Sequence, residues 1–140
     1  MRTNKDLSLQ QLTDRLQPLA VEASSGAPAG GWIRAIRQAL GMTNLQLAQR
    51  VGRDPNTVSD LQAREVKQTI QLGSLRELAN ALECDLVYAF VPRKPLEEIL
   101  EERARLVASK TLRRTGHSME RAMEREVERL LAGSRRKLWE

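Results

Sequence analysis

The sequence has very few of the residues that build disulfides, metal sites and aromatic cores. It contains one cysteine, one histidine, two tryptophans, one tyrosine and one phenylalanine in 140 residues. One cysteine cannot form an internal disulfide, and together with one histidine it cannot supply the ligands of a structural zinc ion. We therefore expect a protein of a reducing compartment that needs no metal and no other cofactor.

Long apolar runs and catalytic motifs are also missing. No stretch approaches the ~18 apolar residues of a membrane span, and the opening MRTNKDLSLQQL lacks the apolar core of a secretion signal. We see no Gly-rich phosphate loop, and His117 has no acidic or thiol partner at catalytic spacing. The sequence thus predicts a soluble, cytoplasmic protein that is not an enzyme and does not bind membranes.

The charge of the chain favours an anionic partner. Lys and Arg total 23 against 18 Asp and Glu, which gives a net charge of +5 at pH 7. A basic balance of this size suits nucleic acid or an anionic membrane surface, and charge alone does not choose between them. Acids interleaved with bases along the C-terminal helices make the membrane surface the weaker alternative.

The pattern of apolar residues and breakers divides the chain into three predicted segments. Residues 1–30 read as a short helix and the linker SSGAPAGG. Residues 31–91 read as an all-helical domain that ends in a strand. Residues 92–140 read as a C-terminal helical extension interrupted at Gly116, whose alternating charges are typical of solvent-exposed helix faces. The predicted fold class is therefore all-α with one short β-strand.

Helix start signals are frequent in the second segment. Thr43 and Gln46 form a capping box, and Asp54 is a good N-cap that is followed by a proline at the first helical position. Ser74 and Glu77 form another capping box, before LRELANAL. The apolar periodicity predicts core positions at Trp32, Ile33, Ile36, Leu40, Leu45, Leu47, Ala48, Val51, Val58 and Leu61.

The stretch LQLAQRVGRDPNTVSDLQ has the pattern of a helix-turn-helix. Ala48 is a small residue where two helices can cross closely, and Gly52 tolerates the positive φ of a tight turn. Both helices carry inward aliphatic residues, and the second also has short polar side chains facing outward. The alternative is a helical hairpin of some other all-α domain, and the capping signals of the flanking helices favour the DNA-binding interpretation.

The run DLVYAFVP predicts a strand from Asp85 to Val91. Both faces of this strand are apolar, and a lone strand leaves its backbone groups unpaired. Its partner would be TIQL, at residues 69–72, the identical strand of a second subunit, or both, and we favour the second subunit. The residues expected to form this dimer are Leu86, Val87, Tyr88, Phe90 and Val91.

Residues 31–83 resemble the five-helix domain of the Cro/C1-type repressors, the XRE family. The segments GWIRAIRQALGMTNLQLAQRVG, TIQLGSLRELANALECDLVYAFVPR and GSRRKLWE are similar to the bacterial XRE-type regulators called mobile mystery protein A. Those regulators are typically encoded beside a Fic-domain protein. The resemblance implies a lambda-repressor-like fold and a dimeric repressor of its own operon that binds double-stranded DNA, and it suggests the antitoxin half of a toxin–antitoxin pair.

The same resemblance leaves a second function open. The C-terminal half, residues 96–140, would bind and neutralise a Fic-domain partner. The usual Fic inhibitory pattern, Ser or Thr followed four residues later by Glu and then Gly or Asn, is absent from the sequence. This absence argues against obstruction of a Fic active site by the usual helix, and it does not argue against binding.

The resemblance, together with the cations that flank the predicted second helix, gives candidate contacts with DNA. Asn56 is the best candidate to read a base, because its amide can pair with adenine. Arg53, Arg64 and Lys67 are candidates for holding phosphates, with solvated surface as the alternative. Asp60 either accepts from a cytosine or pairs with Arg64 four residues later, and we favour the ion pair. The full set is Asn44, Arg53, Pro55, Asn56, Thr57, Ser59, Asp60, Arg64 and Lys67.

Overall fold

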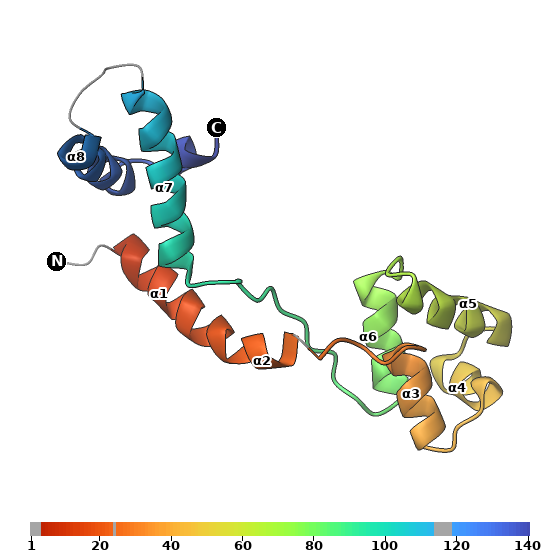
Figure 1. The fold of residues 1–140 in the computed structure, drawn as a ribbon. Helices are drawn as coiled ribbons and strands as arrows, with labels where there is room; N and C mark the ends of the chain where they lie inside the picture. Colours follow the sequence, from red (N-terminus) through yellow and green to blue (C-terminus); the bar gives the residue numbers. More distant parts are fainter. Residues whose placement is uncertain (1–3, 24, 114–118) are drawn as a thin grey trace. The chain divides into compact units, whose positions relative to one another are not determined.

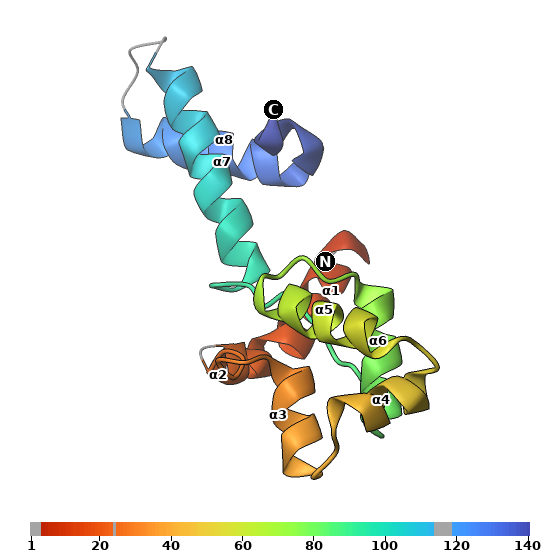
Figure 2. The ribbon, with the colours of Figure 1, turned by 90° about the vertical axis from the view of Figure 1, so that its right-hand side faces the viewer.

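The computed structural model describes residues 4–23, 25–113 and 119–140, so that Gly116 and His117 lie outside the described residues. The chain forms two compact units (Figures 1 and 2). Residues 24–89 make one, here called the central unit, and residues 1–23 together with 90–140 make the other, the terminal unit. The three predicted segments therefore differ from these units, because α1 (Asn4–Leu16) packs against the C-terminal helix α7 (Leu96–Leu112).

Four helices build the described part of the central unit. They bury one apolar cluster, as the periodicity predicts for amphipathic helices. The buried residues are Ile33, Leu47, Ala48, Val58, Leu61, Leu78 and Leu82. The helices are α3 (Trp32–Ala39), α4 (Asn44–Val51), α5 (Pro55–Val66) and α6 (Leu72–Ala81).

Some predictions for this unit are wrong. Trp32, Leu40 and Leu45 are not core residues, because their exposed fractions are 54%, 58% and 54%. Ser74 is not an N-cap: α6 begins at Leu72, with Gln71 in the N-cap position and no side-chain hydrogen bond there.

The predicted strand is not observed. Within the described residues every regular element is helical, and residues 85–91 are neither helix nor strand. The candidate partner TIQL instead leads into α6, so the described chain offers nothing for residues 85–91 to pair with. Val87, Tyr88 and Phe90 consequently expose 82%, 62% and 90% of their surface.

The terminal unit packs α7 against three other elements. Ala104 and Ala108, four residues apart on α7, are fully buried, and such small side chains allow helices to approach closely. Thr13 of α1 accepts a hydrogen bond from the Leu96 N–H, 3.3 Å away, and so caps α7, whose own N-cap position is a proline. The elements are α1, η1 (Gln17–Leu19), α2 (Ala20–Ala23), α7, α8 (Met119–Ala132) and η2 (Arg135–Trp139).

Two negative findings concern the described residues. None of their helices is both long and apolar enough to span a bilayer. In the same ranges, no group of three or more His, Cys, Asp or Glu side chains is arranged to hold a metal ion.

Candidate nucleic-acid interface

The turn between α4 and α5 has the local chemistry that its sequence predicts. Thr43 and Gln46 form a reciprocal capping box: the Gln46 N–H lies 3.1 Å from the Thr43 hydroxyl, and the Thr43 N–H lies 2.8 Å from the Gln46 side chain. Gly52 ends α4 with φ 74°, a left-handed conformation that glycine adopts without steric cost. Asp54 then caps α5 by accepting from the Asn56 N–H at 2.8 Å. These three predictions are confirmed.

Buried aliphatic residues join α4 to α5. Leu47 and Val58 have no exposed surface, and Ala48 has only 1%. Because protein interiors pack at crystal-like density, this contact sets how α5 lies on α4. The helix pair therefore presents the first turns of α5 on a rigid support.

The outward face of α5 carries short polar side chains. Asn56, Thr57 and Asp60 are exposed, and the side chain of Asn56 makes no hydrogen bond to any described residue. Its amide donor and acceptor are thus both available to a ligand. Pro55, at the first helical position, is half-buried.

Asn44 is the centre of a hydrogen-bond network between the two helices. Its amide nitrogen donates to the Pro55 carbonyl at 3.1 Å and to the Ser59 hydroxyl at 3.0 Å. Its oxygen accepts from the buried Gln62 side chain at 2.7 Å. Asn44 and Ser59 were both candidates for DNA contact, and here they contact each other. In this structure their visible role is to position α5.

The predicted phosphate-binding cations differ in their partners. Arg53 forms a two-pronged ion pair with Glu77 of α6, at 2.8 Å and 3.1 Å, and this hydrogen-bonded partner raises the pKa of Arg53. Arg64 lies 2.8 Å from Asp60, which confirms the ion pair that we favoured over a base contact. Lys67 is exposed at the C-terminal end of α5. Of the three, only Lys67 makes no ion pair within the described residues.

Two arginines of α3 border this face and were not among the predicted contacts. Arg37 donates to the Gln62 side chain at 3.3 Å and to the Met42 carbonyl at 2.9 Å, which extends the Asn44 network into a third helix. Arg34 is exposed and makes no ion pair with a described residue. Both border a hollow of about 430 Å³. Its lining residues are Ala29, Gly30, Arg34, Arg37, Asn44, Ser59, Gln62, Ala63 and Val66.

The apolar positions of α3 predict its buried face and leave these two arginines without a predicted role. The signal that could have found them is the spacing of Arg34 and Arg37, which places both on one face of a helix. The sequence does not indicate which other helices this face of α3 lies beside.

Glu77 is expected to restrain DNA binding, because it holds Arg53 and adds a negative charge beside it. Replacing Glu77 with Gln should raise affinity for DNA several-fold and steepen the slope of log K against log salt by about 0.9, the value of one further phosphate contact. Titrations at two or more salt concentrations measure both quantities. Glu83→Gln is the matched control, because this exposed carboxylate in the same unit makes no ion pair with a described residue. Equal effects of the two substitutions would contradict a specific role for the Arg53–Glu77 pair.

The comparisons with known proteins agree with this geometry. Residues 33–88 match the family model described as Helix-turn-helix, a range that includes α4, the turn and α5. The comparisons with curated proteins and with solved structures found no match. Residues 33–88 therefore form a helix-turn-helix domain, the kind of domain with which regulators bind DNA.

Proposed function

We propose that the protein is a sequence-specific regulator of transcription that places α5 in the major groove of DNA. The observation that supports this most is the exposed polar face of α5, held on a capped and tightly packed helix pair within a helix-turn-helix domain. A major groove about 12 Å wide admits an α-helix, and its base edges present a distinct pattern for each base pair.

The contacts would divide into two kinds. Asn56 reads a base through its unpaired amide, and Thr57 and Asp60 lie on the same exposed face. Arg34, Lys67 and, once released from Glu77, Arg53 contact phosphates and set the register of α5 on the duplex. Further members of the predicted set, Asn44, Ser59 and Arg64, position this face through the network and the ion pair described above.

We further propose that the regulator acts as a homodimer and represses its own operon in the cytoplasm, without enzymatic activity or a cofactor. A dimer would account for the exposed apolar residues Val87, Tyr88 and Phe90, because two copies of residues 86–91 could pair as strands and cover them. Two reading helices would then meet half-sites about 34 Å apart. The resemblance to mobile mystery protein A supports a neighbouring Fic-domain protein as partner, in a toxin–antitoxin arrangement.

The test contrasts a base-reading residue with a phosphate-binding one. Asn56→Ala should relax selection at one base pair of the site, by about 1–3 kcal/mol of discrimination. Arg34→Gln should instead weaken binding by about the same factor for every DNA sequence. It should also reduce the slope of log K against log salt by about 1. The measurement is selection from a randomised duplex library, followed by titrations with the DNA upstream of the gene.

Several outcomes would contradict the proposal. Wild-type protein that binds the selected and unrelated duplexes equally would exclude sequence-specific recognition. An Asn56→Ala variant with unchanged base preference would exclude Asn56 as the base reader. A tight complex with the neighbouring Fic-domain protein, without selective DNA binding, would support the alternative function of direct neutralisation.

A further inference from the structure

Most of the chain's excess positive charge lies outside the helix-turn-helix. The central unit contains seven Lys and Arg against six Asp and Glu, whereas the terminal unit contains sixteen against twelve. Protein affinity for DNA depends largely on cations that neutralise phosphates. Because the central unit is nearly neutral, the cations of the terminal unit are the larger source of positive charge for contact with an anionic partner.

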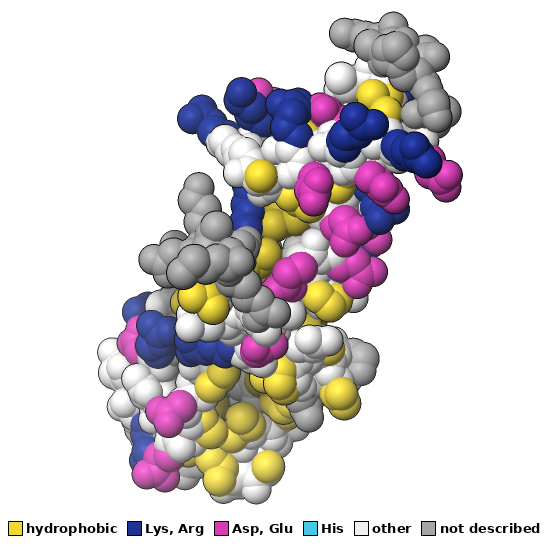
Figure 3. Space-filling view, turned by 90° about the vertical axis from the view of Figure 1, so that its left-hand side faces the viewer, with side chains coloured by type: hydrophobic (Ala, Val, Ile, Leu, Met, Phe, Trp, Pro, Cys, Tyr) yellow, Lys and Arg dark blue, Asp and Glu magenta, His cyan; other side chains and the backbone are white. Residues whose placement is uncertain are grey.

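Arginines follow one another along α8. Arg121, Arg125 and Arg129 are exposed and lie four residues apart, which places them about 6 Å from one another along the helix axis. Arg136 and Lys137 of η2 are also exposed. Figure 3 shows Lys and Arg side chains gathered along the upper part of the view, with Asp and Glu side chains among and beneath them. We call Arg121, Arg125, Arg136 and Lys137 the basic ridge.

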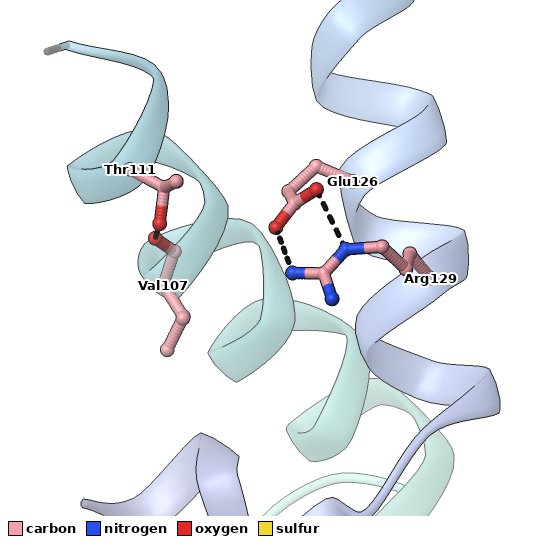
Figure 4. A network of polar contacts seen from close by, with 4 residues as sticks. All are labelled: Val107, Thr111, Glu126 and Arg129. Carbon is pink, nitrogen blue, oxygen red and sulfur yellow. Dashed lines mark hydrogen bonds and ion pairs between the residues drawn. The ribbon is translucent and has the colours of Figure 1, made fainter.

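The cations of the basic ridge have no acidic partner in the part of the chain that the structure describes. None of the four makes an ion pair with a described residue. Arg129 differs, because it pairs with Glu126, whose side chain is only 17% exposed (Figure 4). This ion pair raises the pKa of Arg129 and lowers that of Glu126. Arg129 is thus partly neutralised by Glu126, whereas no described acidic side chain pairs with the four ridge residues.

The C-terminal end of the ridge is anchored and not a loose tail. Leu138 is fully buried, and its carbonyl accepts a hydrogen bond from the Arg103 side chain. The Arg103 guanidinium also lies 5.6 Å from the centroid of the Trp139 ring, a cation–π distance. The backbone that carries Arg136 and Lys137 is therefore ordered before binding, which lowers the entropic cost of contact with a ligand.

We propose that the basic ridge binds the phosphate backbone of duplex DNA without reading its sequence. This inference rests on the proposed function, in which the central unit chooses the site. Duplex DNA presents one negative charge per about 1.7 Å of its axis, so successive cations along a helix can meet successive phosphates. Exposed Glu120, Glu124 and Glu128 each directly precede an arginine of α8, so the positive charge of this helix lies in a line along its axis, which suits a linear row of anions better than a broad acidic protein surface.

The test uses the full chain with Arg121, Arg125, Arg136 and Lys137 all replaced by Gln, which preserves helix propensity. The matched control replaces four exposed cations elsewhere, at positions 15, 76, 93 and 110, and so has the same net charge. We expect the ridge variant to lose about tenfold or more in affinity at 0.1 M salt, and its salt slope to fall by about 2–4. The loss should be equal for the operator and an unrelated duplex, and larger than in the control.

The outcomes separate this inference from the proposed function. A ridge variant that binds like the wild type, with operator preference intact, would overturn the inference and leave the regulator in place; an acidic protein would then be the better partner for the ridge. A loss in the ridge variant that the control matches would also overturn it. Wild-type protein without operator preference, whose DNA binding still depends on the ridge, would support the inference and contradict the proposed function.

Discussion

Replacing Gly31 with Ala is expected to lower the free energy of unfolding of the central unit by about 2–4 kcal/mol, from backbone strain and disturbed hydrogen bonds together. Gly31 has φ 85° and ψ 162°, a region that is almost restricted to glycine. A Cβ there would lie 2.8 Å from a carboxylate oxygen of Glu65. That carboxylate accepts from the N–H groups of Trp32 and Ile33, at 2.6 Å and 2.9 Å, and so caps α3.

Thermal unfolding measures this effect, and for a unit of this size the loss corresponds to about 8–32 °C in Tm. Gly26→Ala is the matched control, because Gly26 also has a positive φ, 67°, and nothing lies within 4 Å of an added Cβ. A Gly31→Ala/Glu65→Ala double variant should lose less than the sum of the single variants, because the clash disappears with the carboxylate. Equal destabilisation by Gly31→Ala and Gly26→Ala would show that the close approach of the added Cβ to Glu65 does not contribute to the loss of stability.

The sequence predicts those parts of the site that depend on neighbours within a few residues. The capping box at Thr43 and Gln46, the turn at Gly52 and the cap at Asp54 are each complete within four residues, and all are observed. The pair between Asp60 and Arg64 belongs to the same class, since both lie on one turn of α5. Such short patterns correctly place the starts of α4 and α5, whereas the equally short pattern at Ser74 and Glu77 misplaces the start of α6.

Contacts between residues far apart in the chain could not be predicted in this way. Glu65 caps α3 from 32 residues away, and Arg53 meets Glu77 from 24 residues away. The local pattern instead predicts a capping box between Glu77 and Ser74, and it gives Glu65 no partner. The same limit explains why the strand predicted at residues 85–91 is not observed. β-branched and aromatic residues favour an extended chain, but a strand also needs a partner strand, and the described chain supplies none.

Replacing Leu138 with Ala is expected to destabilise the terminal unit by about 2–5 kcal/mol, the usual cost of truncating a fully buried leucine. Leu138 has no exposed surface although it is third from the end of the sequence, and η2, which carries it, packs against both α7 and α8. Amide hydrogen exchange should show faster exchange in α7 and α8, with α4 and α5 unchanged. Unchanged protection in α7 would contradict a core role for Leu138.

The neighbouring tryptophan provides the control. Trp139 is 57% exposed, and the Arg103 guanidinium lies 5.6 Å from the centroid of its ring, so Trp139→Ala should cost about 0.5–1 kcal/mol. If the basic ridge contacts DNA, Leu138→Ala should also weaken binding to all duplexes without changing operator preference, because it loosens the turn that holds Arg136 and Lys137. Trp139→Ala should leave most of that affinity intact. A loss of operator preference in Leu138→Ala would instead mean that the terminal unit takes part in reading the sequence.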